Sequence, residues 1–215
     1  MSAARRAVFA IFCFSVCAHA QTRTLAVYSG PAQHLDSSAL HSLQTELQRV
    51  LAPAGIETTW RHPEPDQRER PDVQLVVVGT FDGDCSVDRL LNPSEQLIHT
   101  QTLADSSVSN GHVLPYFRVD CARIIRTLSP ALQSVSIPMR ESILGRALAR
   151  AIAHEIYHVL AQTTGHEKSG IAKAALSLSD LYSVKFDFNS ESLRRMQSPP
   201  LSAPSRNALA VLMSR

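Results

Sequence analysis

The spacing of apolar residues divides the chain into short strands and two amphipathic helices. Apolar runs bounded by turn residues predict four strands, at residues 24–28, 57–61, 73–78 and 113–119. After the first strand, Asp36 is a typical N-cap for a helix with one apolar stripe. The stripe consists of Leu40, Leu43, Leu47, Val50 and Leu51. Pro115 lies within the last of the four strands, which it either disfavours or interrupts with a bulge.

The longest predicted helix begins at Pro138, since proline is favoured in a first helical turn, and continues to about Gln162. Residues 96–103 are compatible with an edge strand before it, and residues 190–196 with a short helix after it. A strand, a helix, further strands and then a long helix predict an α+β fold. In such a fold a mixed, twisted sheet packs on helices.

The first twenty residues have the pattern of a secretory signal peptide. Arg5 and Arg6 precede an apolar stretch at residues 7–16, and Ala18-His19-Ala20 forms a small-residue cleavage site. We therefore expect cleavage after Ala20 and a secreted or periplasmic protein. No later apolar run approaches the length of a membrane span, so none is expected in the mature chain.

One domain is expected to follow the signal peptide. Of the 215 residues 44% are hydrophobic, enough for a single core, which we place in residues 21–197. Residues 198–215 read as an irregular tail, compatible with a short helix at 207–213. The formal net charge of +2 disappears when Arg5 and Arg6 are removed, so the charge does not favour a nucleic-acid partner.

Two of the four cysteines remain after removal of the signal peptide. Cys85 and Cys121 would enter an oxidising compartment, where we expect them to form a disulfide. The alternative is a pair of buried free thiols. Zinc ligation by this pair alone is disfavoured, because zinc cysteines are usually closely spaced.

The predicted long helix carries the chain's most specific chemical pattern, His154-Glu155-Ile156-Tyr157-His158, or H-E-x-x-H. Residues four apart share a helix face, so both imidazoles can bind one metal ion. Glu155 lies about 100° around the helix from His154 and can take a proton from a metal-bound water. Nitrogen ligation by histidine favours zinc.

A catalytic zinc ion needs a third protein ligand and an open position for water. We favour His166, which follows Gly165, a residue that could end the helix in the left-handed conformation and turn the chain back. An acidic third ligand is the alternative. Its candidates are Glu167, Asp180 and Glu191.

On these residues the chain resembles the zincin metallopeptidases, and its order of elements resembles a metzincin-like catalytic domain. The resemblance implies that His154 and His158 bind zinc and that Glu155 is the general base. It also implies that an extended peptide binds to the edge strand, here near residues 96–103. The metzincin pattern H-E-x-x-H-x-x-G-x-x-H is not complete, because Ala161 and Thr164 occupy its glycine and third-histidine positions.

The metzincins also have a methionine turn beneath the metal. No methionine of the chain clearly matches it, and Met196 is the nearest candidate. Tyr182 is a candidate for stabilising the oxyanion.

The sequence therefore predicts an exported, zinc-dependent peptidase, an endopeptidase by its resemblance, that acts on peptide or protein substrates. Glu155 would activate the zinc-bound water. A non-catalytic zinc-binding module of the same fold is the alternative. The intact Glu155 argues against it, because a purely structural zinc site needs no general base.

Overall fold

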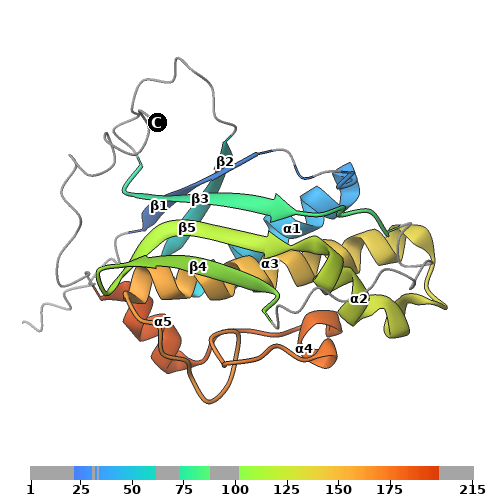
Figure 1. The fold of residues 1–215 in the computed structure, drawn as a ribbon. Helices are drawn as coiled ribbons and strands as arrows, with labels where there is room; N and C mark the ends of the chain where they lie inside the picture. Colours follow the sequence, from blue (N-terminus) through green and yellow to red (C-terminus); the bar gives the residue numbers. More distant parts are fainter. Residues whose placement is uncertain (1–21, 31, 33, 62–72, 88–101, 199–215) are drawn as a thin grey trace, which may run out of the picture.

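A single five-stranded sheet forms the upper layer of the protein, as a computed structural model shows (Figure 1). The structure describes residues 22–198, except for 31, 33, 62–72 and 88–101. The strands are β1 (Arg23–Ser29), β2 (Ile56–Arg61), β3 (Leu75–Asp82), β4 (Ala104–Ser109) and β5 (His112–Asp120). Their order is β2-β1-β3-β5-β4; all neighbours are parallel except β4, which pairs antiparallel with β5.

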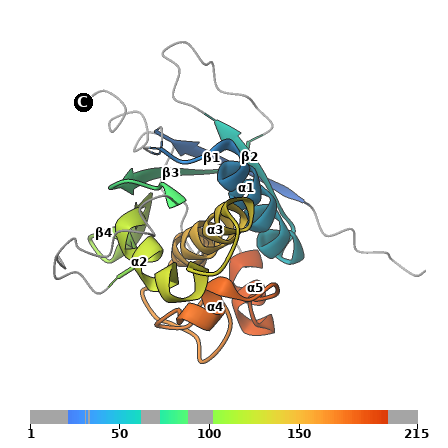
Figure 2. The same cartoon turned by 90° about the vertical axis from the view of Figure 1, so that its right-hand side faces the viewer.

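Helices cover one face of this sheet. They are α1 (Ser37–Leu51), with the 3₁₀ turn η1 (Ala52–Ala54) after it, α2 (Cys121–Leu132), α3 (Ile137–Ala161), α4 (Leu178–Tyr182) and α5 (Ser190–Gln197). Figures 1 and 2 show α1 and α3 next to each other beneath the sheet, with α4 and α5 on the far side of α3. The prediction of a mixed sheet packed on helices is confirmed. None of the helices in the described part of the chain is long and apolar enough to cross a membrane.

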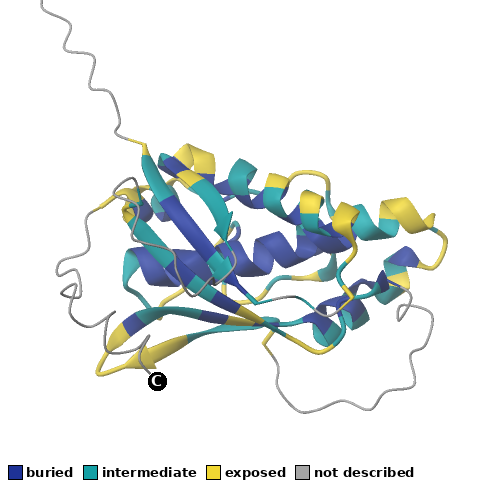
Figure 3. Cartoon of the chain, turned by 90° about the horizontal axis from the view of Figure 1, so that it is seen from above, coloured by how far each residue is buried: buried dark blue, intermediate teal, exposed yellow. Residues whose placement is uncertain are grey.

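The position of α3 between the sheet and the C-terminal helices explains why it is the most buried element (Figure 3). Its close packing on α1 depends on Gly145. A Cβ atom at this position would lie 2.2 Å from the carbonyl oxygen of Ala39 and 2.9 Å from the amide nitrogen of Leu43. Only glycine therefore allows the two helix backbones to approach this closely.

A buried ion pair connects α1 and α3 to the C-terminal segment. Nη2 of Arg150 lies 2.8 Å from Oε1 of Glu46, and both side chains are almost completely buried. Nη1 of Arg150 also donates to the carbonyl oxygens of Asp180, at 2.6 Å, and Leu181, at 3.2 Å. Because a buried charge is costly unless it is paired and hydrogen-bonded, this network holds α4 against α3.

Most of the predicted elements are present at nearly the predicted positions. Asp36 caps α1 through its side chain, and Pro138 lies in the first turn of α3. The register between β4 and β5 shifts between Ser106 and Val108, opposite the part of β5 that contains Pro115, as the bulge prediction required. The expected signal peptide and the C-terminal tail from residue 199 lie outside the described residues.

The structure describes only the last two residues of the edge strand predicted at residues 96–103. Residues 96–101 lie outside the described part of the chain, and Thr102 and Leu103 are not in a strand. The observed edge strand, β4, begins at Ala104 instead. It forms a hairpin with β5 through Asn110 and Gly111, whose positive φ angles of 50° and 78° suit a tight turn.

Candidate metal centre

The two histidines of the H-E-x-x-H pattern lie on one face of α3, as their spacing predicts. Their Nε2 atoms are 3.0 Å apart. Two nitrogen ligands at about 2.0–2.1 Å from a tetrahedral zinc ion would be roughly 3.3 Å apart. The pair of His154 and His158 therefore has the separation of two ligands of one ion.

Backbone carbonyls of the following loop orient both rings. Nδ1 of His154 lies 2.7 Å from the carbonyl oxygen of Ile171, and Nδ1 of His158 lies 2.7 Å from that of Thr163. A carbonyl oxygen can only accept, so Nδ1 of each ring carries the proton and donates it. The lone pair of each neutral ring is then on Nε2, directed to the shared position.

His166 completes a group of three histidines. Its ring centroid lies 5.2 Å from that of His154 and 4.9 Å from that of His158. The ligand atoms of the three side chains all lie within 4.8 Å of one another, so this cluster could hold a metal ion. His166 comes from the loop after α3 and is exposed, whereas His158 is buried and His154 largely so.

Burial keeps the helix-borne imidazoles in the form that binds metals. It lowers the pKa of His154 to about 4, and it also lowers the pKa of His158. Because a charged imidazole is disfavoured away from water, both rings stay neutral at neutral pH. Three imidazoles beside an open cleft are the donor set of a catalytic zinc site, and the residues present therefore fit zinc.

Glu155 lies beside this cluster and is itself buried, with 5% of its surface exposed. Burial raises the pKa of its carboxyl to about 7, and the nearby Asp105 adds to the increase. Ser106 opposes it, because its Oγ donates a hydrogen bond of 2.5 Å to Oε2 of Glu155. A carboxyl with a pKa near 7 can both accept and release a proton at neutral pH.

A cleft of about 440 Å³ opens over the three histidines and Glu155. On one side it is lined by β4, from Ala104 to Val108. The opposite side comes from the loop before α4, and α2 closes part of the wall with Arg123 and Thr127. The loop residues of that opposite side are Ala174, Ala175 and Leu176.

The acidic alternatives for a third ligand all have other partners. Glu167 accepts a hydrogen bond from the hydroxyl of Tyr157, at 3.0 Å. Asp180 pairs with Nζ of Lys173 at 2.6 Å, and Glu191 pairs with Arg194 and Arg195 on its own helix. Among the described residues only the three histidines form a metal-binding group, and none of these acids belongs to it.

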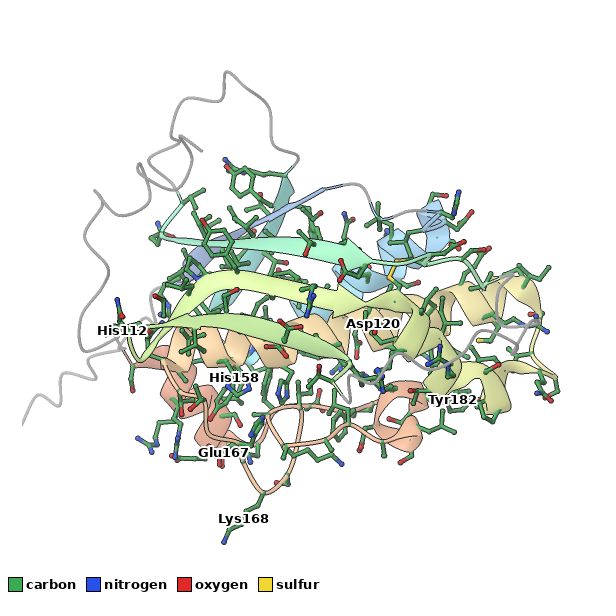
Figure 4. The ribbon with its side chains drawn as sticks, in the orientation of Figure 1. His112, Asp120, His158, Glu167, Lys168 and Tyr182 are labelled. Atoms are coloured by element: carbon green, nitrogen blue, oxygen red, sulfur yellow. A yellow bond between two sulfur atoms is a disulfide. The ribbon has the colours of Figure 1, made fainter. Side chains whose placement is uncertain are left out.

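The other predicted site residues are not part of the cleft. Tyr182 does not line it and lies toward the other end of the molecule from His158 (Figure 4). Met196 is buried within α5 rather than in a turn. Gly165 does not take the left-handed conformation that we predicted for it, because α3 already ends at Gln162, whose φ angle is 46°.

Cys85 and Cys121 form a disulfide in the structure, as predicted. It joins the segment after β3 to the first residue of α2, and both cysteines are fully buried. The disulfide therefore anchors the start of the helix that supplies Arg123 and Thr127 to the cleft.

Several groups that complete the site were not predicted from the sequence. Ser106 and the carbonyls of Thr163 and Ile171 have no sequence signal of their own. They reach the site only because β4 and the loop fold back onto α3. For β4 itself, Asn110-Gly111 was a usable hairpin signal, since this pair favours tight turns.

No family model matches the sequence, and no curated protein does. Among solved structures, the chain is similar to the crystal structure of archaemetzincin from Methanopyrus kandleri, with a TM-score of 0.45 and 12% sequence identity. The match covers 85% of this chain and 97% of that one. At this identity and TM-score, the function of the site has to be inferred from the geometry of its own residues.

Proposed function

We propose that the protein is a zinc-dependent peptidase, an endopeptidase of metzincin-like type. The observation that supports the proposal best is the convergence of three histidines beside a buried carboxyl, in a cleft bordered by an edge strand. His154, His158 and His166 would hold the ion. Among the described residues the cluster contains no fourth protein ligand, so a water molecule could take the remaining position.

When bound, zinc would lower the pKa of a coordinated water to about 7 and polarise the scissile carbonyl. The chain's own residues would move the proton. Glu155 would accept it from the water and later deliver it to the leaving amine, for which its pKa of about 7 is well suited. Ser106 would hold Oε2 of Glu155 and so orient the carboxyl.

The proposed substrate is an extended peptide in the cleft. Among the described residues β4 pairs with β5 alone, so its other edge can take a further strand. The observed edge strand, β4, lies beside Glu155, since Ser106 contacts that residue. Peptide binding along β4 would bring a scissile bond close to the three histidines.

Two features argue against a non-catalytic zinc-binding module. A closed structural site would have four protein ligands, and the described cluster has three. In addition, such a module has no use for a buried carboxyl beside the ion that is not one of its ligands. We therefore favour the peptidase.

We also propose that the protein is exported, with cleavage after Ala20 and a secreted or periplasmic destination. The Cys85–Cys121 disulfide supports this proposal, since disulfides persist mainly in oxidising compartments.

The test is hydrolysis of a mixed peptide library by the purified protein, followed by mass spectrometry of the products. We expect cleavage that a chelator abolishes and added zinc restores. Glu155→Gln should retain zinc but lose cleavage by at least about a hundredfold, since general acid–base catalysis contributes that much. Cleavage that persists under chelation, or in Glu155→Gln, would show that the activity comes from elsewhere.

A further inference from the structure

The third histidine is attached to the molecule in a different way from the other two. His154 and His158 belong to a buried helix, but His166 is exposed and lies in a loop. An exposed loop residue needs another restraint if it is to stay within ligand distance of the helix. The neighbouring residue, Glu167, supplies one.

The carboxylate of Glu167 is bound from two helices. The hydroxyl of Tyr157, in α3, donates to its Oε1 at 3.0 Å, and Nε of Arg195, in α5, lies 3.3 Å from the same oxygen. Only 13% of the Glu167 side chain is exposed, and Tyr157 is fully buried. Figure 4 shows Glu167 beneath His158, on the side of α3 away from the sheet.

The sequence positions of these contacts connect them to the metal site. Tyr157 directly precedes His158, and Glu167 directly follows His166. The hydrogen bond between them therefore ties the helix-borne and loop-borne ligands together without a metal. The backbone contributes as well, because the amide of Glu167 donates to the carbonyl oxygen of Ala172 at 2.8 Å.

We propose that Glu167, bound by Tyr157 and Arg195, is a positioning residue that holds His166 at the metal site and so sets the metal affinity. We call these three residues the Glu167 clamp. The proposal rests on the proposed zinc site but not on catalysis. None of the three side chains lines the cleft, so the Glu167 carboxylate acts on the ion through His166. The ring of Tyr157 also packs edge-on against the ring of His158, with 5.4 Å between centroids, and Tyr157→Phe retains this contact.

The rest of the loop has attachments of its own, which makes the clamp testable without unfolding the loop. The amide of Ile171 donates to the carbonyl oxygen of Asp187 at 3.1 Å, and Nδ2 of Asn189 donates to that of Ser169 at 3.0 Å. These contacts are independent of Glu167. Loss of the clamp should therefore loosen His166 while the carbonyls of Thr163 and Ile171 stay in place.

The experiment measures zinc affinity by competition with a chromophoric chelator. Partners that orient metal ligands are worth about 10- to 100-fold in affinity, so we expect about tenfold weaker binding in Glu167→Ala. Tyr157→Phe and Arg195→Gln should each weaken binding in the same direction. Glu167→Gln should recover much of the affinity, because its amide oxygen can still accept from Tyr157.

Two control variants match these changes. Arg194→Gln removes a neighbouring arginine of α5 that pairs with Glu191 but not with Glu167, and Tyr182→Phe removes an exposed hydroxyl outside the cleft. Both should bind zinc as the unmodified protein does. The melting temperature of each metal-free variant shows whether a loss of affinity reflects a loss of folding.

A double-mutant cycle decides whether the clamp acts through His166. In a His166→Ala background, Glu167→Ala should have no further effect on zinc affinity, because the ligand that it positions is already absent. Cobalt substitution gives a second readout: Glu167→Ala and His166→Ala should change the visible absorption spectrum in the same way. An equal loss in both backgrounds, or unchanged affinity in Glu167→Ala, would overturn the proposal.

The outcome is separate from that of the proposed function. If the protein binds zinc and cleaves no peptide, the peptidase proposal fails and the clamp can still be measured. If it cleaves peptides with zinc and Glu167→Ala binds zinc normally, only the clamp is wrong.

Discussion

The three histidines of the candidate metal centre come from two regions that differ in how they hold a side chain. On α3, helix geometry places His154 and His158 on one face, and burial in the core keeps that helix rigid. Between Gln162 and α4 the chain is irregular, and the residue after His166, Glu167, is held by contacts with α3 and α5. One region is specified locally, and the other depends on the rest of the fold.

The two regions also depend on each other. The loop supplies the carbonyl oxygens of Thr163 and Ile171 that orient the rings on the helix. The helix in turn supplies Tyr157, which binds the loop through Glu167. In the proposed zinc site, the helix would contribute a preformed pair of ligands, and the loop would determine how tightly and in which geometry the site closes.

The largest expected effect is the loss of a helix-borne ligand. Zinc sites bind with about 10–16 kcal/mol, so one of four ligands accounts for about 2.5–4 kcal/mol, or roughly sixty- to seven-hundredfold in affinity. We expect a loss of this size in His154→Ala and in His158→Ala. In His166→Ala we expect about thirtyfold, because water can replace an exposed ligand and the loop no longer has to be ordered.

Chelator competition on all three variants measures this difference. His112→Ala is the control, since this histidine is exposed and lies away from His158 (Figure 4). Equal losses for the three ligands would show that helix and loop hold the ion equally well. The helix-borne ligands would then not bind the ion more tightly than the loop-borne one.

The same distinction explains which parts of the molecule the sequence could predict. Local patterns predicted their elements nearly correctly. They are the apolar stripe of α1, the apolar runs of β1 and β3, and the H-E-x-x-H spacing on α3. β4 was not predicted, because its residues, ADSSVS, have low strand propensity and pairing with β5 determines its position. Tertiary context outweighed local preference there.

The helix end shows a similar limit. Gln162 takes the left-handed conformation although Gly165 is the better candidate by propensity. Its side-chain Nε2 donates to the carbonyl oxygens of Val113, at 2.9 Å, and Val159, at 2.8 Å. These bonds offset the cost of a positive φ angle, and the first of them requires β5 to be in place. The helix α2 was not predicted from the sequence, although Asp120 is a typical N-cap, because Pro130 near its end is unfavourable inside a helix.

Two glycines allow a second test of the comparison. Gly145 lies where α3 meets α1, and a Cβ there would clash with backbone atoms. In Gly145→Ala we expect the free energy of unfolding to fall by about 3 kcal/mol, the cost of overpacking a core. Gly170, in the loop, has a φ angle of 75°, and a Cβ there would lie 2.7 Å from the carbonyl oxygen of Asp187.

For Gly170→Ala we expect a smaller loss of about 1–2 kcal/mol, since strain at a single residue is of this size. Zinc affinity should fall in this variant. Gly145→Ala should bind zinc normally under conditions where it remains folded. Denaturant unfolding of the metal-free proteins and chelator titration give the two readouts. If Gly145→Ala weakened zinc binding more than Gly170→Ala did, the loop after α3 would not be the part of the molecule that determines zinc affinity.

The smallest expected effect is local and follows from removal of the metal. Without zinc, His166 loses its tie to the helix pair, while the core around α3 keeps all of its apolar contacts. Hydrogen exchange should therefore accelerate by about tenfold at the amides of residues 163–173, equivalent to about 1.4 kcal/mol of local stability. The amides of α3 should keep their protection, because their exchange requires opening of the buried core. Since Glu167 remains bound to Tyr157 in the metal-free protein, its own amide should change less than that of His166. Equal acceleration along α3 and the loop would mean that the metal stabilises the whole domain, and the helix pair would then not be preformed.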